Sequence, residues 1–286
     1  LRNTFRYLLG ALDGFSEAER VSDVAAMPEL ERYVLALLAQ LDATLKTAAE
    51  TFDFNTYVRA LTDFCNEDLS AFFFDIRKDC LYCDAVTDPK RMAYRTVLDT
   101  LFHALVRYAA PVLVFTAEEV WGTRYPDGGS VHLLEWPTLP RQPVLDTGQG
   151  FSSSAAPEGS LAPEQVRGDD LVERWKSIRV IRNGVNEAIE PLRREKVLGS
   201  SLEAEVTVPM HIAYDGQYDG LDWSEVTITA SMRLSHPSGE FNGPISVTRT
   251  THHKCGRCWR HLPEVTEDGA LCSRCDQVVA GMDAGA

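Results

Sequence analysis

The sequence lacks any long apolar run and is short of positive charge. No stretch approaches the ~18 consecutive apolar residues of a membrane-spanning helix. The 28 Lys and Arg residues stand against 42 Asp and Glu, a formal net charge of −14. That balance argues against a general nucleic-acid coat protein, because neutralising phosphates requires a basic surface. The chain also shows no apolar secretory segment, and three cysteines remain beyond the metal-type set described below. We therefore expect no membrane partner and a reduced, cytoplasmic setting.

Catalytic signatures are missing as well. The sequence contains no glycine-rich phosphate-binding loop and no His, Ser and Asp combination in a recognisable catalytic motif. We assign no catalytic residue to this chain. Its composition is that of an ordinary globular protein, with 44% hydrophobic and 24% charged residues. A length of 286 residues is enough for two domains and a small appendage.

Four cysteines near the end of the sequence carry the strongest chemical signal. They form two Cys-x-x-Cys pairs, Cys255-Gly-Arg-Cys258 and Cys272-Ser-Arg-Cys275. This spacing is typical of a structural zinc site, in which each tight turn supplies two corners of a tetrahedron. Because sulfur would fill all four positions, no site remains for a catalytic water. The alternative is a pair of disulfides. A third pair, Cys80 and Cys83, stands alone in an apolar helical stretch, and we interpret it as packed or half-exposed free thiols.

The first half of the sequence has helical periodicity. One apolar stripe follows Pro28, and its members are Leu30, Val34, Leu37, Leu38, Leu41 and Leu45. A second stripe runs from Tyr57 to Phe72, with Asp53 near its N-cap. Asp88-Pro89 predicts the start of a third helix, Pro111 its interruption, and Thr116-Ala-Glu-Glu119 the start of a fourth. Long amphipathic helices with short joins predict an antiparallel bundle over residues 1–140.

The composition then changes twice. Residues 141–168 are rich in Pro, Gly, Ser and Ala, which predicts a flexible linker or insertion. The remainder predicts a small α+β module over 169–250: a helix from Leu171 that Pro191 stops, and strands at Glu203–Pro209, around Val226 to Ala230, and around Ile245 to Val247. Residues 251–286 complete the chain as a four-cysteine zinc finger and tail. The predicted fold class is therefore mainly α, with an antiparallel helix bundle, a small α+β module and a zinc finger.

Two short segments oppose the overall acidity. Residues 176–196 contain six Lys and Arg against three Glu, and residues 249–260 contain four Lys and Arg with no carboxylate. An acidic body with two basic tips can still bind a polyanion locally. In the first segment, the alternative is a solvated surface whose cations pair with Glu187, Glu190 and Glu195.

Several longer strings resemble the C-terminal third of bacterial isoleucyl-tRNA synthetases. The segments Leu1 to Gly10, Asp68 to Lys78, Ala110 to Glu119 and Val131 to Trp136 are similar to parts of the helical anticodon-binding domain of that family. Gly199-Ser-Ser-Leu-Glu-Ala204 separates the isoleucine enzymes from their valine and leucine relatives. Lys254-Cys-Gly-Arg-Cys-Trp-Arg260 resembles the terminal zinc finger of the family, a finger type also found in some DNA glycosylases.

The resemblance implies the function. The parent enzyme joins isoleucine to tRNA(Ile) and uses ATP and Mg²⁺, whereas this region would contribute anticodon recognition and one structural Zn²⁺. The His-Ile-Gly-His and Lys-Met-Ser-Lys-Ser type motifs of the catalytic domain do not occur in the sequence, and neither does the editing domain. We therefore expect a region that follows the catalytic core, is inactive alone, has that missing N-terminal core as its partner, and is monomeric.

Three alternatives remain. They are a stand-alone RNA-binding or regulatory zinc protein, a valine- or leucine-specific synthetase, and a DNA-glycosylase type of zinc protein. The last lacks the N-terminal Pro and Glu that those glycosylases use, because the sequence starts Leu1-Arg2.

Ten residues are candidates for RNA contact. They are Arg2, Arg6, Arg179, Arg182, Arg193, Arg194, Lys196, Arg257, Trp259 and Arg260. Arg2 and Arg6 lie one helical turn apart and either face the RNA or fix the junction to the catalytic core, and we favour the junction. Trp259 either stacks on a base or caps the small core of the finger. Arg179 and Arg182 share one helix face.

Overall fold

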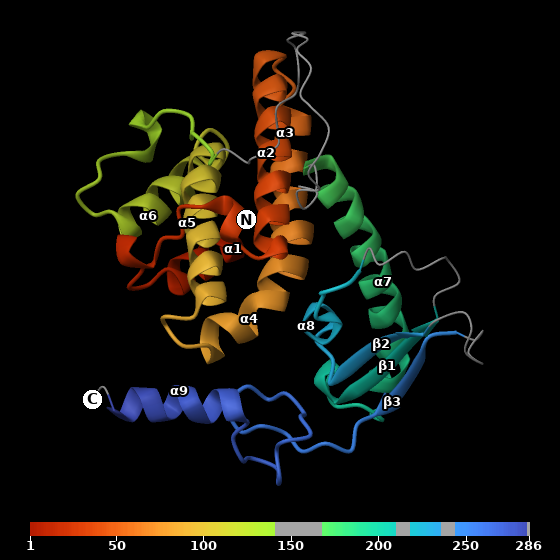
Figure 1. Cartoon of the computed structure of the whole chain (residues 1–286). Coiled ribbons are helices and arrows are strands. Elements are labelled where there is room, and N and C mark those ends of the chain that lie inside the picture. The colour runs from red at the N-terminus through yellow and green to blue at the C-terminus, as the bar shows by residue number, and fades with distance from the viewer. Residues whose placement is uncertain (141–167, 210–217, 236–243, 285–286) are drawn as a thin grey trace, which may run out of the picture. The chain divides into compact units, whose positions relative to one another are not determined.

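The computed structural model describes residues 1–140, 168–209, 218–235 and 244–284 (Figure 1). The predicted linker over 141–168 lies, apart from its final residue, outside this described part. The chain divides into two compact units. The first contains Leu1–Phe73 and Met92–Trp175, and the second contains Phe74–Arg91 and Lys176–Ala286. The boundaries predicted at 140, 168 and 250 stay predictions.

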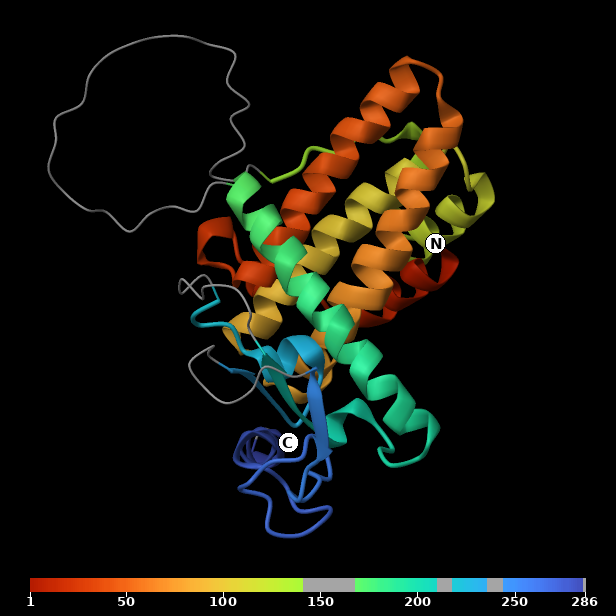
Figure 2. The same ribbon diagram turned by 90° about the vertical axis from the view of Figure 1, so that its right-hand side faces the viewer.

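The first unit is a bundle of helices. Its elements are α1 (Arg2–Ala11), α2 (Glu29–Glu50), α3 (Phe54–Asp63), the π-helical segment η3 (Phe64–Phe73), most of α5 (Pro89–Ala109) and α6 (Val114–Arg124), with short 3₁₀ turns η1 (Glu17–Glu19), η2 (Val24–Ala26) and η4 (Val131–Leu133). Helices α2, α3 and α5 run side by side, as the two views in Figures 1 and 2 show. The predicted helix bundle is confirmed.

Local sequence chemistry explains where these helices begin. Asp53 caps α3, since its Oδ1 accepts the Thr56 N–H at 3.1 Å. Asp88 precedes Pro89, and its Oδ1 accepts the N–H groups of Lys90 at 2.8 Å and Arg91 at 3.2 Å. Both caps agree with the sequence prediction. The α2 stripe faces inward, with Val34, Leu38 and Leu45 fully buried.

The predicted start of α6 at Thr116 is wrong. The helix begins at Val114, with Leu113 as its N-cap. The Leu113 N–H donates to the Ala109 carbonyl at 2.7 Å, so the turn made by Pro111 leads directly into α6. Glu119, the acidic residue of the predicted capping box, has an exposed side chain 3.9 Å from Arg2 Nη2.

The second unit combines helices with a small sheet. Its elements are α4 (Phe74–Cys83), most of α7 (Gly168–Arg194), η5 (Ser201–Glu203), β1 (Ala204–Pro209), α8 (Trp223–Thr227), β2 (Ser231–Ser235), β3 (Ser246–Arg249) and α9 (Ser273–Ala284). The strand order is β2-β1-β3. Val206 of β1 pairs with Met232 in parallel and with Val247 in antiparallel register. Gly184 brings α7 close to the segment before β3, where an added Cβ would lie 3.3 Å from Ile245 Cδ1.

Two predictions in this unit are wrong. Pro191 does not stop α7, which continues to Arg194. Proline removes one N–H donor, but its carbonyl still accepts the Glu195 N–H at 2.9 Å, so a last turn forms. Lys196 then ends the helix in the left-handed conformation, with φ at 62°. The Val197 N–H donates to the Leu192 carbonyl and the Lys196 N–H to the Arg193 carbonyl, as in a Schellman motif.

The strand predicted around Val226 to Ala230 is instead the short helix α8. Asp222 caps it by accepting the Glu225 N–H at 3.1 Å, and Ile228 ends it with φ at 55°. The alternating apolar residues Val226, Ile228 and Ala230 are as compatible with one helical turn as with a strand. The strand itself starts later, at Ser231.

Ion pairs hold α4 and the segment after it to the rest of the second unit. Arg77 Nη1 and Lys90 Nζ both lie 2.8 Å from Glu225 Oε1. Arg182 Nη2 lies 2.9 Å from Asp75 Oδ2, and its Nε donates to the Val226 carbonyl. Arg77 is 4% exposed and Arg182 is 7% exposed, so these are interior contacts.

Candidate metal centre and nucleic-acid interface

The four predicted cysteine ligands come together in one compact segment, residues 254–275, which we call the knuckle. Cys255 and Cys258 lie on a turn, and Cys272 and Cys275 lie at the start of α9. The Gly256 N–H donates to the Ala270 carbonyl at 3.0 Å. A Cβ on Gly256 would lie 2.4 Å from the Gly269 carbonyl oxygen, so only glycine allows this close approach of the two loops.

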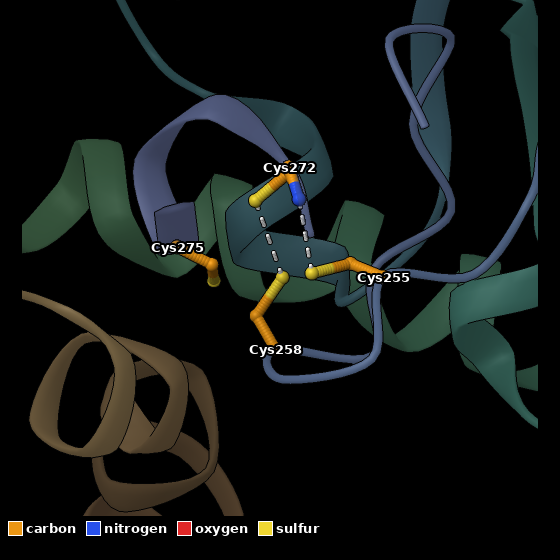
Figure 3. Close-up of side chains that lie close together, drawn as sticks. All are labelled: Cys255, Cys258, Cys272 and Cys275. Atoms are coloured by element: carbon orange, nitrogen blue, oxygen red, sulfur yellow. Dashed lines mark hydrogen bonds between the residues drawn. The ribbon is translucent and has the colours of Figure 1, made fainter. Parts of the chain in front are cut away.

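The sulfur atoms converge on one point (Figure 3). All four lie within 4.8 Å of one another and all four cysteines are buried. Cys258 Sγ and Cys272 Sγ are 3.9 Å apart. A tetrahedral Zn²⁺ with bonds of 2.3 Å places its sulfurs about 3.8 Å apart. All seven cysteines are free, which differs from the disulfide alternative. The residues present therefore fit a tetrahedral metal ion.

Local hydrogen bonds lower the pKa of one of these four thiols, Cys255, and so favour its thiolate form. Burial raises the pKa of a thiol, but N–H groups of the Arg257, Cys258 and Cys272 backbone outweigh it at Cys255 and lower its pKa to about 6. Burial raises the pKa of Cys258 and raises that of Cys275 to about 11. Metal binding at neutral pH must therefore displace protons from some of the four ligands.

The knuckle has little apolar core of its own. The only buried residues clustered with the four cysteines in the described part of the chain are Val265 and Cys83, with Leu262, Ala270 and Leu271 half-buried around them. So small a core cannot stabilise the segment alone. Cys80 and Cys83 are buried free thiols in α4, as predicted, and burial raises the pKa of Cys83 to about 12.

The RNA-contact candidates divide by exposure. Arg2 and Arg6 are exposed on α1, and Arg2 Nη2 lies 3.9 Å from Glu119. Arg193, Arg194 and Lys196 are exposed at the end of α7. Arg193 and Arg194 lie 3.7 Å and 4.0 Å from carboxylate oxygens of Glu190, which are weak surface contacts.

The remaining candidates on α7 do not share one environment. Arg179 is half-buried, whereas Arg182 is buried. Burial lowers the pKa of Arg182, and Asp75 partly compensates. The guanidinium of Arg182 is thus committed to Asp75 and to the Val226 carbonyl.

The three RNA-contact candidates of the knuckle also differ in their exposure and contacts. Trp259 is 61% exposed, so its ring does not cap the finger core, and Lys254 Nζ lies 5.0 Å from the ring centroid. Its backbone is left-handed, with φ at 65°, which is uncommon for a bulky residue. Arg260 is half-buried, and no described contact holds its guanidinium. Arg257 bonds to the backbone of α4, with Nη1 2.5 Å from the Cys83 oxygen.

Sequence reasoning missed a cavity beside the knuckle and the residues that shape it. A cavity of about 430 Å³ lies within the second unit, lined among others by Ile76, Tyr82, Leu202, Ile228, Trp259 and Arg260. Tyr82 is 64% exposed. Sequence reasoning also passed over Arg274, which bonds to Asp79 and Asp84. A signal existed for Arg274, because both cysteine pairs have the form Cys-x-Arg-Cys.

Comparison with known proteins defines the class. Residues 31–208 match the family described as the anticodon-binding domain of tRNA ligase, and the chain belongs to that family. Among the relatives is the isoleucine–tRNA ligase of Zymomonas mobilis, 55% identical over 284 residues, which cover 98% of this chain and 27% of that protein. Those of Gluconobacter oxydans and Ruegeria pomeroyi are 44% and 40% identical, covering 98% and 96% of this chain and 27% of each protein. The predicted resemblance to isoleucine enzymes is confirmed.

The match covers only part of the length of these relatives. The chain spans about a quarter of the length of these relatives. None of the helices in the described part is both long enough and apolar enough to cross a membrane.

Proposed function

We propose that this chain is the tRNA-recognition region of an isoleucine–tRNA ligase, and that it binds tRNA(Ile) through its anticodon. The observation that carries the proposal is the family match over residues 31–208 together with relatives that are isoleucine–tRNA ligases over nearly the whole chain. The catalytic core that uses ATP and Mg²⁺ would be the partner of this region in the same enzyme. We further propose a monomeric, cytoplasmic protein, and that the four-cysteine site holds one structural Zn²⁺.

The exposed residues suggest how the RNA is held. Single-stranded anticodon bases are read by stacking and by hydrogen bonds to their edges. Trp259 has an exposed ring with Lys254 beside it, and Arg260 lies next to it in the chain. We assign base stacking to Trp259 and phosphate contact to Arg260, Arg193, Arg194 and Lys196. Arg257, Arg179 and Arg182 are less accessible candidates, and Arg2 and Arg6 would fix the junction to the catalytic core.

The first test is filter binding of the zinc-loaded chain to one tRNA body carrying isoleucine, valine or methionine anticodons at fixed, moderate salt. Binding that prefers the isoleucine anticodon supports an autonomous recognition module. Equal or absent binding means that recognition requires the rest of the enzyme.

Two substitutions sharpen this test. Trp259→Ala is expected to weaken binding by about 1–3 kcal/mol, the usual worth of base–aromatic stacking, whereas Trp259→Phe retains part of it. Arg59→Gln removes one charge from an exposed position on α3 that is not a candidate, and serves as the control. Equal losses for Trp259→Ala and Arg59→Gln would refute the stacking assignment.

A separate measurement addresses catalysis. We expect no isoleucine-dependent ATP–pyrophosphate exchange from this chain alone, because it contains none of the catalytic motifs of the parent family. Measurable exchange by the purified chain would contradict this.

A further inference from the structure

Each cysteine pair of the knuckle carries an arginine directly before its second cysteine. These are Arg257 before Cys258 and Arg274 before Cys275. Both side chains reach the same place, the C-terminal end of α4, which is about 175 to 195 residues earlier in the sequence. An arginine is suited to such a role because its planar fork donates several hydrogen bonds at once.

Arg257 joins the metal centre to the last carbonyls of α4. Its Nη1 donates to the Cys83 carbonyl at 2.5 Å and its Nη2 to the Tyr82 carbonyl at 3.1 Å. The same Nη1 lies 3.8 Å from Cys275 Sγ. The final carbonyls of a helix have no partner within the helix and carry partial negative charge. The guanidinium therefore faces a helix end and a metal-ligating sulfur together, and no carboxylate contacts it in the described structure.

Arg274 makes a second connection with different chemistry. Its Nη1 and Nη2 bind the two carboxylate oxygens of Asp79 at 2.6 Å and 2.9 Å. Nη1 also lies 2.8 Å from Asp84 Oδ1, and the Asp84 side chain is only 6% exposed. The fork geometry fixes the second cysteine turn against α4. Cys83, at the end of α4, is itself packed among the four cysteines.

Charge explains why the two arginines matter to the metal. Four thiolates and one divalent cation carry a net charge of −2, and most of that charge resides on buried sulfur. Groups that hydrogen-bond to ligand atoms orient them and tune the metal. Arg257 contacts Cys275 Sγ and has no carboxylate partner in the described structure, whereas Arg274 is paired with Asp79 and Asp84 and also hydrogen-bonds to Cys258.

We propose that Arg257 and Arg274 are positioning residues of the metal centre, which couple metal occupancy to the docking of the knuckle on the end of α4. Coupling of this kind is reciprocal: α4 strengthens metal binding to the same extent that the metal strengthens docking. The inference rests on the proposed metal binding and is independent of tRNA binding.

The test compares Zn²⁺ affinity of the full chain and its variants by competition with a chromophoric chelator. Arg257→Gln is expected to weaken affinity by about 10- to 100-fold, as for other groups that orient metal ligands. Arg257→Lys keeps the charge but loses the two-carbonyl fork, and should recover part of the affinity. Arg260→Gln is the matched control, since it removes an arginine of the same knuckle that has no described contact with α4 or with sulfur. We expect it to change affinity less than threefold.

A variant far from the knuckle in sequence tests the coupling itself. Asp84→Asn weakens the link to Arg274 without touching a cysteine, and is expected to lower Zn²⁺ affinity severalfold. With Co²⁺ in the site, Arg257→Gln should also shift the thiolate-to-metal charge-transfer band, which a purely structural role would leave unchanged. Arg257→Gln and Asp84→Asn affinities equal to those of Arg260→Gln would overturn the inference.

The wild-type chain provides a measurement that does not depend on any variant folding. Removing the metal with a chelator should increase amide hydrogen exchange at residues 82–85, at the end of α4, while peptides from α2 stay unchanged. Unchanged exchange at 82–85 would overturn the coupling. If the wild-type chain fails to bind Zn²⁺ at all, the metal proposal itself fails, which is distinguishable from equal affinities among variants.

Discussion

The two units of this protein are stabilised by different means. The twelve largest fully buried side chains in the described structure all belong to the first unit, among them Tyr33, Tyr94, Phe102 and Trp175. The fully buried side chains among the described residues of the second unit include the smaller, aliphatic Ile178, Val185 and Leu198. Its interior contacts include Arg77 with Glu225, Arg182 with Asp75, and the four cysteines.

This difference follows from size and chemistry. A helix bundle buries enough apolar surface to be stabilised mainly by the hydrophobic effect. Short strands, a five-residue helix and a knuckle bury less apolar surface, so charge pairs and the four-cysteine site supplement a smaller core. The comparison predicts that chelation and pH act on the second unit, and that cavity-forming substitutions act on the first.

Loss of a metal ligand should have the largest effect, and should destabilise the second unit only. Cys272→Ser deletes one of four buried ligands, and structural zinc contributes about 10–16 kcal/mol in zinc-finger peptides at neutral pH. We expect loss of bound Zn²⁺ and of amide protection across residues 254–275, with protection in α5 retained. Metal analysis and hydrogen exchange measure both.

Cys65 supplies the matched control for that substitution. It is a buried free cysteine of the first unit. Cys65→Ala should leave the Zn²⁺ content at its wild-type value. Zinc loss from Cys65→Ala, or a Cys272→Ser chain that retains zinc, would contradict the assignment of the four ligands.

A cavity in the bundle should have the next largest effect. Leu101 on α5 is fully buried, and Leu101→Ala is expected to lower the free energy of unfolding of the first unit by about 3–4 kcal/mol. Leu133→Ala is the control, since that side chain is 85% exposed, and should cost less than about 0.5 kcal/mol. Urea unfolding followed by circular dichroism gives both values, and similar costs would refute the apolar-core description.

Features set by neighbouring residues were predictable from the sequence. The caps at Asp53 and Asp88, the α2 stripe and the Cys-x-x-Cys spacing each depend on a few adjacent residues. The helix α8 was missed because alternating apolar residues fit either a strand or one buried turn. Only the left-handed Ile228 and the Asp222 cap distinguish them.

Long-range contacts could not be predicted in the same way. Arg182 looked like a surface cation, yet its partner Asp75 lies 107 residues earlier. Arg257 looked like part of a basic flank, but the end of α4 takes its guanidinium. The sequence gives the sign of the net charge of a segment. The packing of a distant helix against that segment determines which of its charged side chains remain exposed.

The smallest of the three effects concerns the ion pairs of the second unit. Glu225 is 19% exposed in its side chain and accepts from both Arg77 and Lys90. Glu225→Gln removes the carboxylate charge that faces both the buried Arg77 and Lys90, which should cost about 3 kcal/mol of unfolding free energy at pH 7. Urea unfolding of the second unit measures this loss.

The pH dependence of that loss identifies its cause. Burial alone would raise the pKa of Glu225, but Arg77 and Lys90 outweigh it and the pKa is lowered from its ordinary value of 4.5. A carboxyl with a lowered folded-state pKa stabilises the fold fully above its unfolded pKa, and this stabilisation disappears as the pH falls through the folded value. The difference between wild type and Glu225→Gln should therefore be constant from pH 7 to about pH 5 and shrink below about pH 4.5. Glu190→Gln, at an exposed pair with Arg193, should cost less than about 0.5 kcal/mol throughout. A Glu225→Gln cost that persists unchanged at pH 3 would assign the loss to packing and not to the charge of the carboxylate.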